Sequence, residues 1–177
     1  MKNNDNFQNC LDAAFRFLTY RPRSEAETRS RLHRLGHEDE QIEKVIAHLK
    51  KLELLDDEAF AKYWKENRNS FNPRGRRMLR SELRNKGVDS EVIDEVVKDT
   101  DDKDNAYRSA MKRARTLSLS DYSQFRRRLS SYLQRRGFEF GVINNAVKEA
   151  WQERLKESGQ NPSKNEECRT EGKYEIN

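Results

Sequence analysis

The chain has 177 residues, of which 33% are hydrophobic and 38% are charged, whereas soluble domains contain roughly 45–50% apolar and about 25% charged residues. This composition excludes one thick core and favours thin helical layers that each bury one face. The net charge of +5 is small, so the distribution of charge is more informative than the total. We expect a cytoplasmic protein, because the sequence lacks a run of ~18 apolar residues, a signal-peptide core and enough cysteines for a disulfide framework.

The first predicted helix carries an apolar stripe, and a proline-containing link follows it. After Pro22, the pattern Ser24-x-x-Glu27 is a capping box that starts a second helix. Gly36 ends that helix, because glycine adopts the left-handed conformation of a helix C-terminus at no steric cost. A third helix follows, for which Asp39 is the expected N-cap. The apolar spacing of the first and third helices is i, i+3, i+4, at Cys10, Leu11, Ala14, Leu18 and at Ile42, Val45, Ile46, Leu49.

The same order of elements recurs twice more along the chain. The turn glycines Gly36, Gly87 and Gly137 lie 51 and 50 residues apart. Each copy has Ser six and Leu four residues before its glycine, then Ile six and a β-branched residue ten residues after it. Pro73 and Ser90 repeat the link and the expected N-cap. The structural positions expected from this repeat and from the first helix of the second copy are Leu32, Gly36, Phe60, Trp64, Leu83, Gly87, Leu133 and Gly137.

The repeat predicts an all-α fold of three tandem three-helix units of about 50 residues, each with a helix-turn-helix outline. We place repeat 1 at residues 1–52, repeat 2 at 53–102 and repeat 3 at 103–152, with a polar, disordered tail at 153–177. Because one such unit buries little surface alone, stacking in tandem predicts an elongated, slightly curved rod. A long exposed surface of this kind favours binding over catalysis.

Charge is distributed unevenly among these units. The net charge is +2 for residues 1–52, −3 for 53–102 and +7 for 103–152. The second helices of repeats 2 and 3 are basic, and the third helix of repeat 2 is acidic. The basic positions are Arg74, Arg76, Arg77, Arg80, Arg126, Arg127, Arg128, Arg135 and Arg136, and the acidic positions are Asp89, Glu91, Asp94 and Glu95.

The helix-turn-helix outline raises the possibility of a DNA major-groove reader. Its recognition helix would be the third of a unit, which repels phosphate in repeats 1 and 2, so this mode of binding is disfavoured. The arginines of repeat 3 lie near Tyr122, Phe125, Tyr132 and Phe138, a composition that suits phosphate contact and base stacking. The alternative is a solvated helix face that balances acidic neighbours, and a charge of +7 in fifty residues is harder to explain in that way.

The sequence contains little that indicates catalysis. His33 and His37 have a metal-ligand spacing, but Gly36 interrupts the helix between them and no further ligand completes a set. Phosphate-binding glycine loops and nucleophile-elbow motifs are absent from the sequence. Asp56 and Asp57 are interpreted as a helix start, and Cys10 as a small core residue. We therefore expect no enzyme, no cofactor and no metal site.

The stretch LLDDEAFAKYWKENR, from Leu54 to Arg68, resembles the signature of the RecX family, the regulatory proteins of the RecA recombinase. The segments from Arg21 to Glu27 and from Glu82 to Val88 are also similar to that family, and the resemblance runs from about Asn9 to Trp151. Thr28 departs from it, since an aliphatic residue is expected there. The resemblance implies cytoplasmic binding to RecA filaments on single-stranded DNA, with inhibition of RecA ATP hydrolysis, strand exchange and coprotease activity.

Charge and resemblance together give one hypothesis and two competitors. In the first, a non-catalytic monomer places its acidic third helices against RecA, and the arginines of repeat 3 near DNA or an acidic RecA surface. Free DNA is expected to bind more weakly than the filament. The second hypothesis is a helix-turn-helix protein that acts directly on DNA, and the third is an enzyme. No membrane partner is expected.

Overall fold

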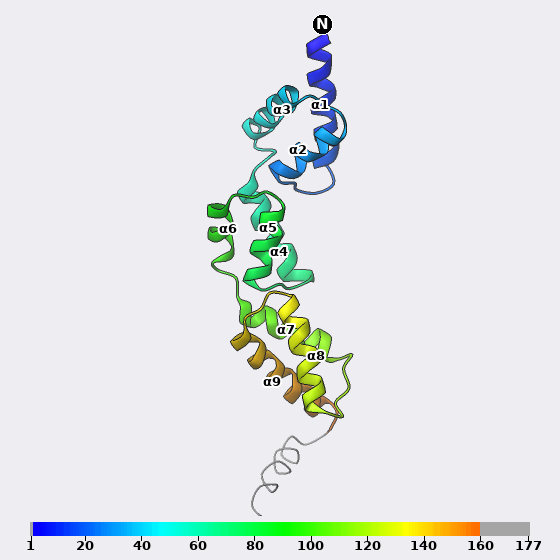
Figure 1. Ribbon diagram of the computed structural model, residues 1–177, viewed down its shortest axis with the longest axis vertical. Coiled ribbons are helices and arrows are strands. Elements are labelled where there is room, and N and C mark those ends of the chain that lie inside the picture. Colours follow the sequence, from blue (N-terminus) through cyan, green and yellow to red (C-terminus); the bar gives the residue numbers. More distant parts are fainter. Residues whose placement is uncertain (1, 160–177) are drawn as a thin grey trace, which may run out of the picture. The chain divides into compact units, whose positions relative to one another are not determined.

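A computed structural model describes residues 2–159, with the side chains of residues 2–4 left out of the description. Within this range the chain forms nine α-helices and no strand (Figure 1), which confirms the all-α prediction. The helices are α1 (Lys2–Leu18), α2 (Glu25–Arg34), α3 (Asp39–Lys51), α4 (Asp57–Phe71), α5 (Arg76–Asn85), α6 (Ser90–Val97), α7 (Asp102–Ala114), α8 (Tyr122–Arg135) and α9 (Phe140–Glu157). No described helix is long and apolar enough to cross a bilayer.

The helices group by contacts into two compact units. Of the described residues, the first unit comprises 2–72 and 76–100, and the second comprises 73–75 and 101–159. The first unit therefore holds α1–α6 and the second holds α7–α9 with the short segment Pro73–Gly75. The division into repeats at residues 52, 102 and 152 and the curved rod remain predictions.

In the first unit, α1–α3 and α4–α6 each enclose a core of their own. The core of α1–α3 is centred on Leu32 of α2, which is fully buried, and Cys10 of α1 is also 0% exposed. The core of α4–α6 contains Phe60 and Leu83 at 1% and 0% exposure. Burial of a side chain of this size stabilises the fold by about 1.5–3 kcal/mol relative to its exposure.

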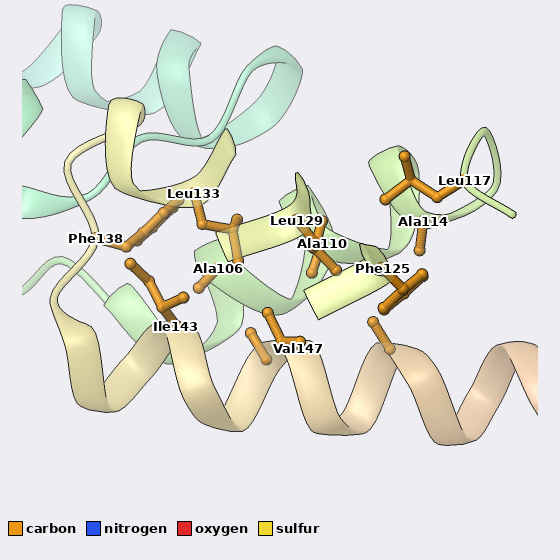
Figure 2. Close-up of a cluster of buried hydrophobic side chains, with 12 residues drawn as sticks. Ala106, Ala110, Ala114, Leu117, Phe125, Leu129, Leu133, Phe138, Ile143 and Val147 are labelled. Carbon is orange, nitrogen blue, oxygen red and sulfur yellow. The ribbon is translucent and has the colours of Figure 1, made fainter. Parts of the chain in front are cut away.

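In the second unit, α7 presents a stripe of small residues to its neighbours. Ala106, Ala110 and Ala114 are spaced four apart on one face and are all fully buried, which lets the helix axes approach closely. Figure 2 shows Ile143 and Val147 of α9 pointing toward the side chains from α7 and α8. The rest of this core consists of Leu117, Phe125, Leu129, Leu133, Phe138, Ala146 and Ala150.

The glycine turns have the expected backbone. Gly36, Gly87 and Gly137 have φ values of 84°, 76° and 85°, the left-handed region that disfavours side chains. In all three turns, the amide of the residue after the glycine donates to the carbonyl five residues earlier. His37 N donates to Leu32 O at 3.3 Å, Val88 N to Leu83 O at 3.2 Å and Phe138 N to Leu133 O at 3.4 Å. The glycines thus end α2, α5 and α8 as the repeat predicted.

The prediction of N-caps at Asp39 and Ser90 is wrong by one residue. The caps are Glu38 for α3 and Asp89 for α6, and Asp39 and Ser90 are the first helical residues. The cap of α9 is Glu139, so all three caps lie two residues after the turn glycine. The turn geometry fixes this position, and in repeat 2 the Asp89 carboxylate accepts from Glu91 N at 2.8 Å.

Two further expectations are modified by the structure. Helix α9 continues through residues 153–157, which we had assigned to the disordered tail, because Leu155 is buried at 2% exposure. Residues 160–177 lie outside the described residues. Thr28 is fully buried, and its hydroxyl donates to Ser24 O at 2.9 Å. The polar residue is therefore satisfied within its own helix turn.

Candidate nucleic-acid and protein interfaces

Helix α8 carries four exposed arginines that have no partner among the described residues. Arg126, Arg127, Arg128 and Arg135 are exposed, and within residues 2–159 their guanidinium groups take part in no hydrogen bond or ion pair. Successive helical residues point roughly 100° apart, so the first three fan around the helix, and Arg128 and Arg135 share one side. Four unpaired cations on one helix favour an anionic partner outside this repeat.

Arg136 does not belong to this exposed face. It is half-buried, its Nη1 donates to Pro73 O at 3.0 Å, and its guanidinium lies 4.5 Å from the centre of the Tyr132 ring. Burial lowers the pKa of Arg136 from its ordinary value. A backbone hydrogen bond adds to this contact, since Gly75 N donates to Arg136 O at 2.9 Å. Arg136 therefore holds the segment Pro73–Gly75 within the second unit.

Two of the four arginines of α5 are engaged inside the first unit. Arg76 Nη2 donates to Thr100 O at 3.0 Å, and Arg80 Nε pairs with Asp94 Oδ1 at 2.9 Å. Arg77 is exposed and Arg74, which belongs to the segment of the second unit, is half-buried. The predicted basic cluster of repeat 2 is thus dispersed, unlike that of repeat 3.

The acidic positions of α6 are also partly committed. Asp89 caps the helix, Asp94 pairs with Arg80, and the carboxylate of Glu95 pairs with Lys98. Glu91 is exposed, and within the described chain its carboxylate has no polar partner. Exposed ion pairs contribute little to stability, so these carboxylates remain accessible to a competing cationic partner.

A half-buried ion network joins the first two repeats inside the first unit. Glu27 of α2 pairs with Arg21 at 3.0 Å and with Lys86 at 2.7 Å. Burial alone would raise the pKa of Glu27, but the hydrogen bonds from Arg21 and Lys86 outweigh it and lower the pKa to about 2. Ser24 Oγ also donates to Lys86 O at 2.6 Å. These contacts fix α2 against the end of α5.

Trp64 packs against the core of α4–α6, as the sequence predicted, and also takes part in this junction. The indole is half-buried, its Nε1 donates to Glu82 Oε2 at 2.8 Å, and Arg68 Nε donates to the same oxygen at 2.7 Å. Lys86 Nζ lies 4.4 Å and the Arg68 guanidinium 4.5 Å from the ring centre. Cation–π contacts and hydrogen bonds therefore hold the side chain in place.

A second link at the junction uses the start of α4. The Asp57 carboxylate accepts from Glu25 N at 2.8 Å, while Asp56 caps α4 by accepting from Glu58 N and Ala59 N. Burial raises the pKa of Asp57. The interpretation of these two carboxylates as a helix start is confirmed, and Asp57 also satisfies a donor at the start of α2.

An apolar surface around Tyr20 escaped the sequence analysis. Tyr20 is 85% exposed and stands on the rim of two hollows of about 360 and 710 Å³ in the first unit. Phe15, Leu35 and Leu54 are also exposed there, at 37%, 47% and 51%. Arg16 and Arg31 line the smaller hollow, which contains no carboxylate. Aromatic residues beside arginines are the composition typical of protein interfaces.

Among the described residues, neither the histidines nor Cys10 forms a reactive site. His33 Nε2 contacts Asp39 Oδ1 at 2.6 Å, and no group of three or more potential metal ligands occurs among the described residues. Cys10 is fully buried, as expected, and burial raises the pKa of its thiol. A protonated buried thiol is unreactive.

The fold and these surfaces define a class of protein: an all-α array of three-helix repeats with exposed charged and apolar faces. Family models of the first, second and third three-helix domains of RecX match residues 10–49, 56–97 and 100–147. Similar proteins named regulatory protein RecX include those of Chlorobium limicola, 32% identical over 78% of this chain and 87% of that protein, and of Chlorobaculum tepidum, 36% identical over 78% and 86%. The chain belongs to the RecX family of regulatory proteins, which confirms the resemblance found in the sequence.

Solved structures show the same fold. The crystal structure of RecX from Lactobacillus salivarius matches with a TM-score of 0.71 and 21% identity, covering 83% of this chain and 97% of that one. A second crystal structure, of a regulatory protein RecX, matches with a TM-score of 0.73 and 20% identity, over 84% of this chain and 75% of that one. At this identity the match supports the arrangement of helices alone.

Proposed function

We propose that the chain is a non-catalytic regulator that binds RecA and RecA filaments on single-stranded DNA in the cytoplasm, and mainly inhibits RecA. The inhibited activities would be ATP hydrolysis, strand exchange and coprotease activity. Membership of the RecX family supports a regulatory role. The observation that carries the proposal is the set of four unpaired, exposed arginines on α8, which calls for an anionic partner.

In this proposal the repeats have separate tasks. The arginines of repeat 3 contact DNA or an acidic surface of the filament. The remaining faces contact RecA, through Glu91 of α6 and through the apolar surface around Tyr20. The arginines of that surface complement carboxylates on the partner, and its exposed aromatic side chains provide the contacts that dominate interface energetics. A monomer suffices, because each face lies within one chain.

The test is a titration of the protein into RecA that hydrolyses ATP on single-stranded DNA. We expect strong inhibition at well below one copy per RecA subunit, because one bound copy affects many subunits of a filament. Replacing Arg126, Arg127 and Arg128 with Glu should raise the protein concentration needed for half-maximal inhibition at least ten-fold. Unchanged ATP hydrolysis at equimolar protein, with filaments verified by microscopy, would contradict the proposal.

A matched control distinguishes the effect of the α8 arginines from the effect of the protein's net charge. The triple variant Arg34→Glu, Lys44→Glu and Lys51→Glu makes the same charge change on exposed positions of repeat 1, and it should inhibit like the parent protein. Equal loss in both triple variants would show that only net charge matters. Sequence-selective binding to free duplex DNA would instead favour the competing helix-turn-helix hypothesis.

A further inference from the structure

Repeats 1 and 2 share an ion pair that repeat 3 lacks. Arg29 pairs with Glu43 at 2.7 Å in repeat 1, and Arg80 pairs with Asp94 at 2.9 Å in repeat 2. Counted from the turn glycine, both pairs join the residue at −7 to the residue at +7. In repeat 3 these positions are Ser130 and Asn144, so the second and third helices are not joined by an ion pair there.

The neighbouring positions keep their cations and lose a second carboxylate. In repeat 2, Arg76 at −11 donates to Thr100 O and Lys98 at +11 pairs with Glu95 at +8. Their equivalents in repeat 3 are Arg126 and Lys148, and Asn145 takes the place of Glu95. Two carboxylates have thus become amides while both cations remain.

A hollow opens in repeat 3 beside these replacements. It measures about 260 Å³ and lies between α8 and α9, lined by Tyr122, Arg126, Asn144, Val147 and Lys148. Arg126 and Lys148 are exposed, and neither has a polar partner among the described residues. The lining holds two cations, an amide and a phenol with no carboxylate, which is the chemistry of an anion site.

We propose that this hollow binds a phosphodiester of single-stranded nucleic acid, with Arg126 and Lys148 on the phosphate and Asn144 as a hydrogen-bonding neighbour. The buried Val147 and the ring of Tyr122, which packs 5.1 Å from the Trp151 ring, supply an apolar wall for the adjacent sugar or base. The inference rests on the proposed function in one respect, which is that the bound strand is taken to be DNA. The inference locates phosphate binding at one site among the arginines of repeat 3, and it explains why Asn144 and Asn145 replace the carboxylates found in repeat 2.

The sharpest test restores the carboxylate of the other repeats. Asn144→Asp replaces the amide nitrogen with a carboxylate oxygen on a half-buried side chain that lines the hollow. Gln134→Glu makes the same charge change eight residues from Arg126 on α8 and serves as the control. Binding of a fluorescent oligo-dT strand, without RecA, is followed by anisotropy at several salt concentrations, and helicity is verified for each variant by circular dichroism.

We expect Asn144→Asp to weaken oligo-dT binding three- to ten-fold and to reduce the salt dependence by about one phosphate contact. Adding Asn145→Glu should weaken it further, while Gln134→Glu stays within two-fold of the parent. Equal weakening by Asn144→Asp and Gln134→Glu, or no oligo-dT binding by the parent protein, would overturn the inference.

Two further measurements separate the sources of the anion and the two proposals. Displacement of oligo-dT by inorganic phosphate at low millimolar concentration would show a site for free phosphate and overturn the assignment to a strand. ATP hydrolysis by RecA is measured in parallel. An inactive protein in that assay that still shows the expected oligo-dT pattern would contradict the proposed function and leave this site standing.

Discussion

Repeats 2 and 3 have matching cores and opposite surfaces. Leu83 and Leu133 occupy the same position and are both fully buried, as are Ile93 and Ile143 within a few per cent. The net charge nevertheless changes from −3 to +7 between the two repeats. The difference teaches that the buried stripe and the glycine turn, rather than the surface charge, specify this three-helix unit, since solvent-facing positions differ in charge while the fold is the same.

The strongest way to break this comparison is to truncate the shared core. Leu83→Ala and Leu133→Ala should each reduce the free energy of unfolding by about 2–5 kcal/mol, through lost burial and the cavity left behind. Urea denaturation followed by circular dichroism measures both. Exposed Arg84 and Gln134 provide Ala controls that should change stability by less than about 0.5 kcal/mol. A much smaller loss for one leucine would mean that the two cores are not equivalent.

The two repeats also differ in the residue just before the turn glycine, and this difference predicts a pH dependence of stability. Lys86 holds a carboxylate, that of Glu27, whereas Arg136 at the same position holds the carbonyl of Pro73. Because the folded pKa of Glu27 is lowered to about 2, its contribution to stability is complete above the unfolded pKa of about 4.3 and is lost as the pH falls toward 2. That contribution is on the order of 2 kcal/mol.

Glu27→Gln should therefore destabilise the protein at pH 7 and converge with the parent protein near pH 2. The measurement is the difference in free energy of unfolding between the two proteins at pH values from 7 to 2. A difference that stays constant over this range would show that the network acts through packing rather than through charge.

The smallest expected effect concerns the exposed ion pair of repeat 2. A double-mutant cycle on Arg80→Ala and Asp94→Ala should give a coupling of about 0.2–1 kcal/mol, because both side chains are partly exposed. The equivalent cycle on Ser130→Ala and Asn144→Ala in repeat 3 should give no coupling. Coupling of similar size in both cycles would contradict the view that repeat 3 has lost this interaction.

The sequence predicted the parts of the fold that are local. The glycines located the turns, and the periodicity of apolar residues located the cores, because a turn and a helix face each depend on residues less than about ten positions apart. The N-caps were misplaced since Asp39 and Ser90 were judged by side-chain type alone. The repeat spacing would have predicted the correct N-caps, because Glu38, Asp89 and Glu139 all lie two residues after a turn glycine.

The candidate sites were predicted less completely, because they depend on which helices meet. The run from Arg126 to Arg128 was treated as one cluster, although consecutive residues on a helix point in different directions. Trp64 packs against a core as predicted, but its partners Glu82 and Lys86 come from α5 and were not foreseen. The surface around Tyr20 combines residues from three helices and the links between them, which no local pattern reveals.

The buried thiol of Cys10 can report on local opening of the core formed by α1, α2 and α3. Since the sulfur lies in a core residue that is 0% exposed, a thiol reagent can reach it only when α1 separates from α2 and α3. Its labelling rate, in a chain where Cys168 is replaced by Ser, would therefore read out the local opening equilibrium of that core under native conditions. Slower labelling in the presence of RecA filaments would then reveal whether binding rigidifies the N-terminal repeat, without any introduced probe.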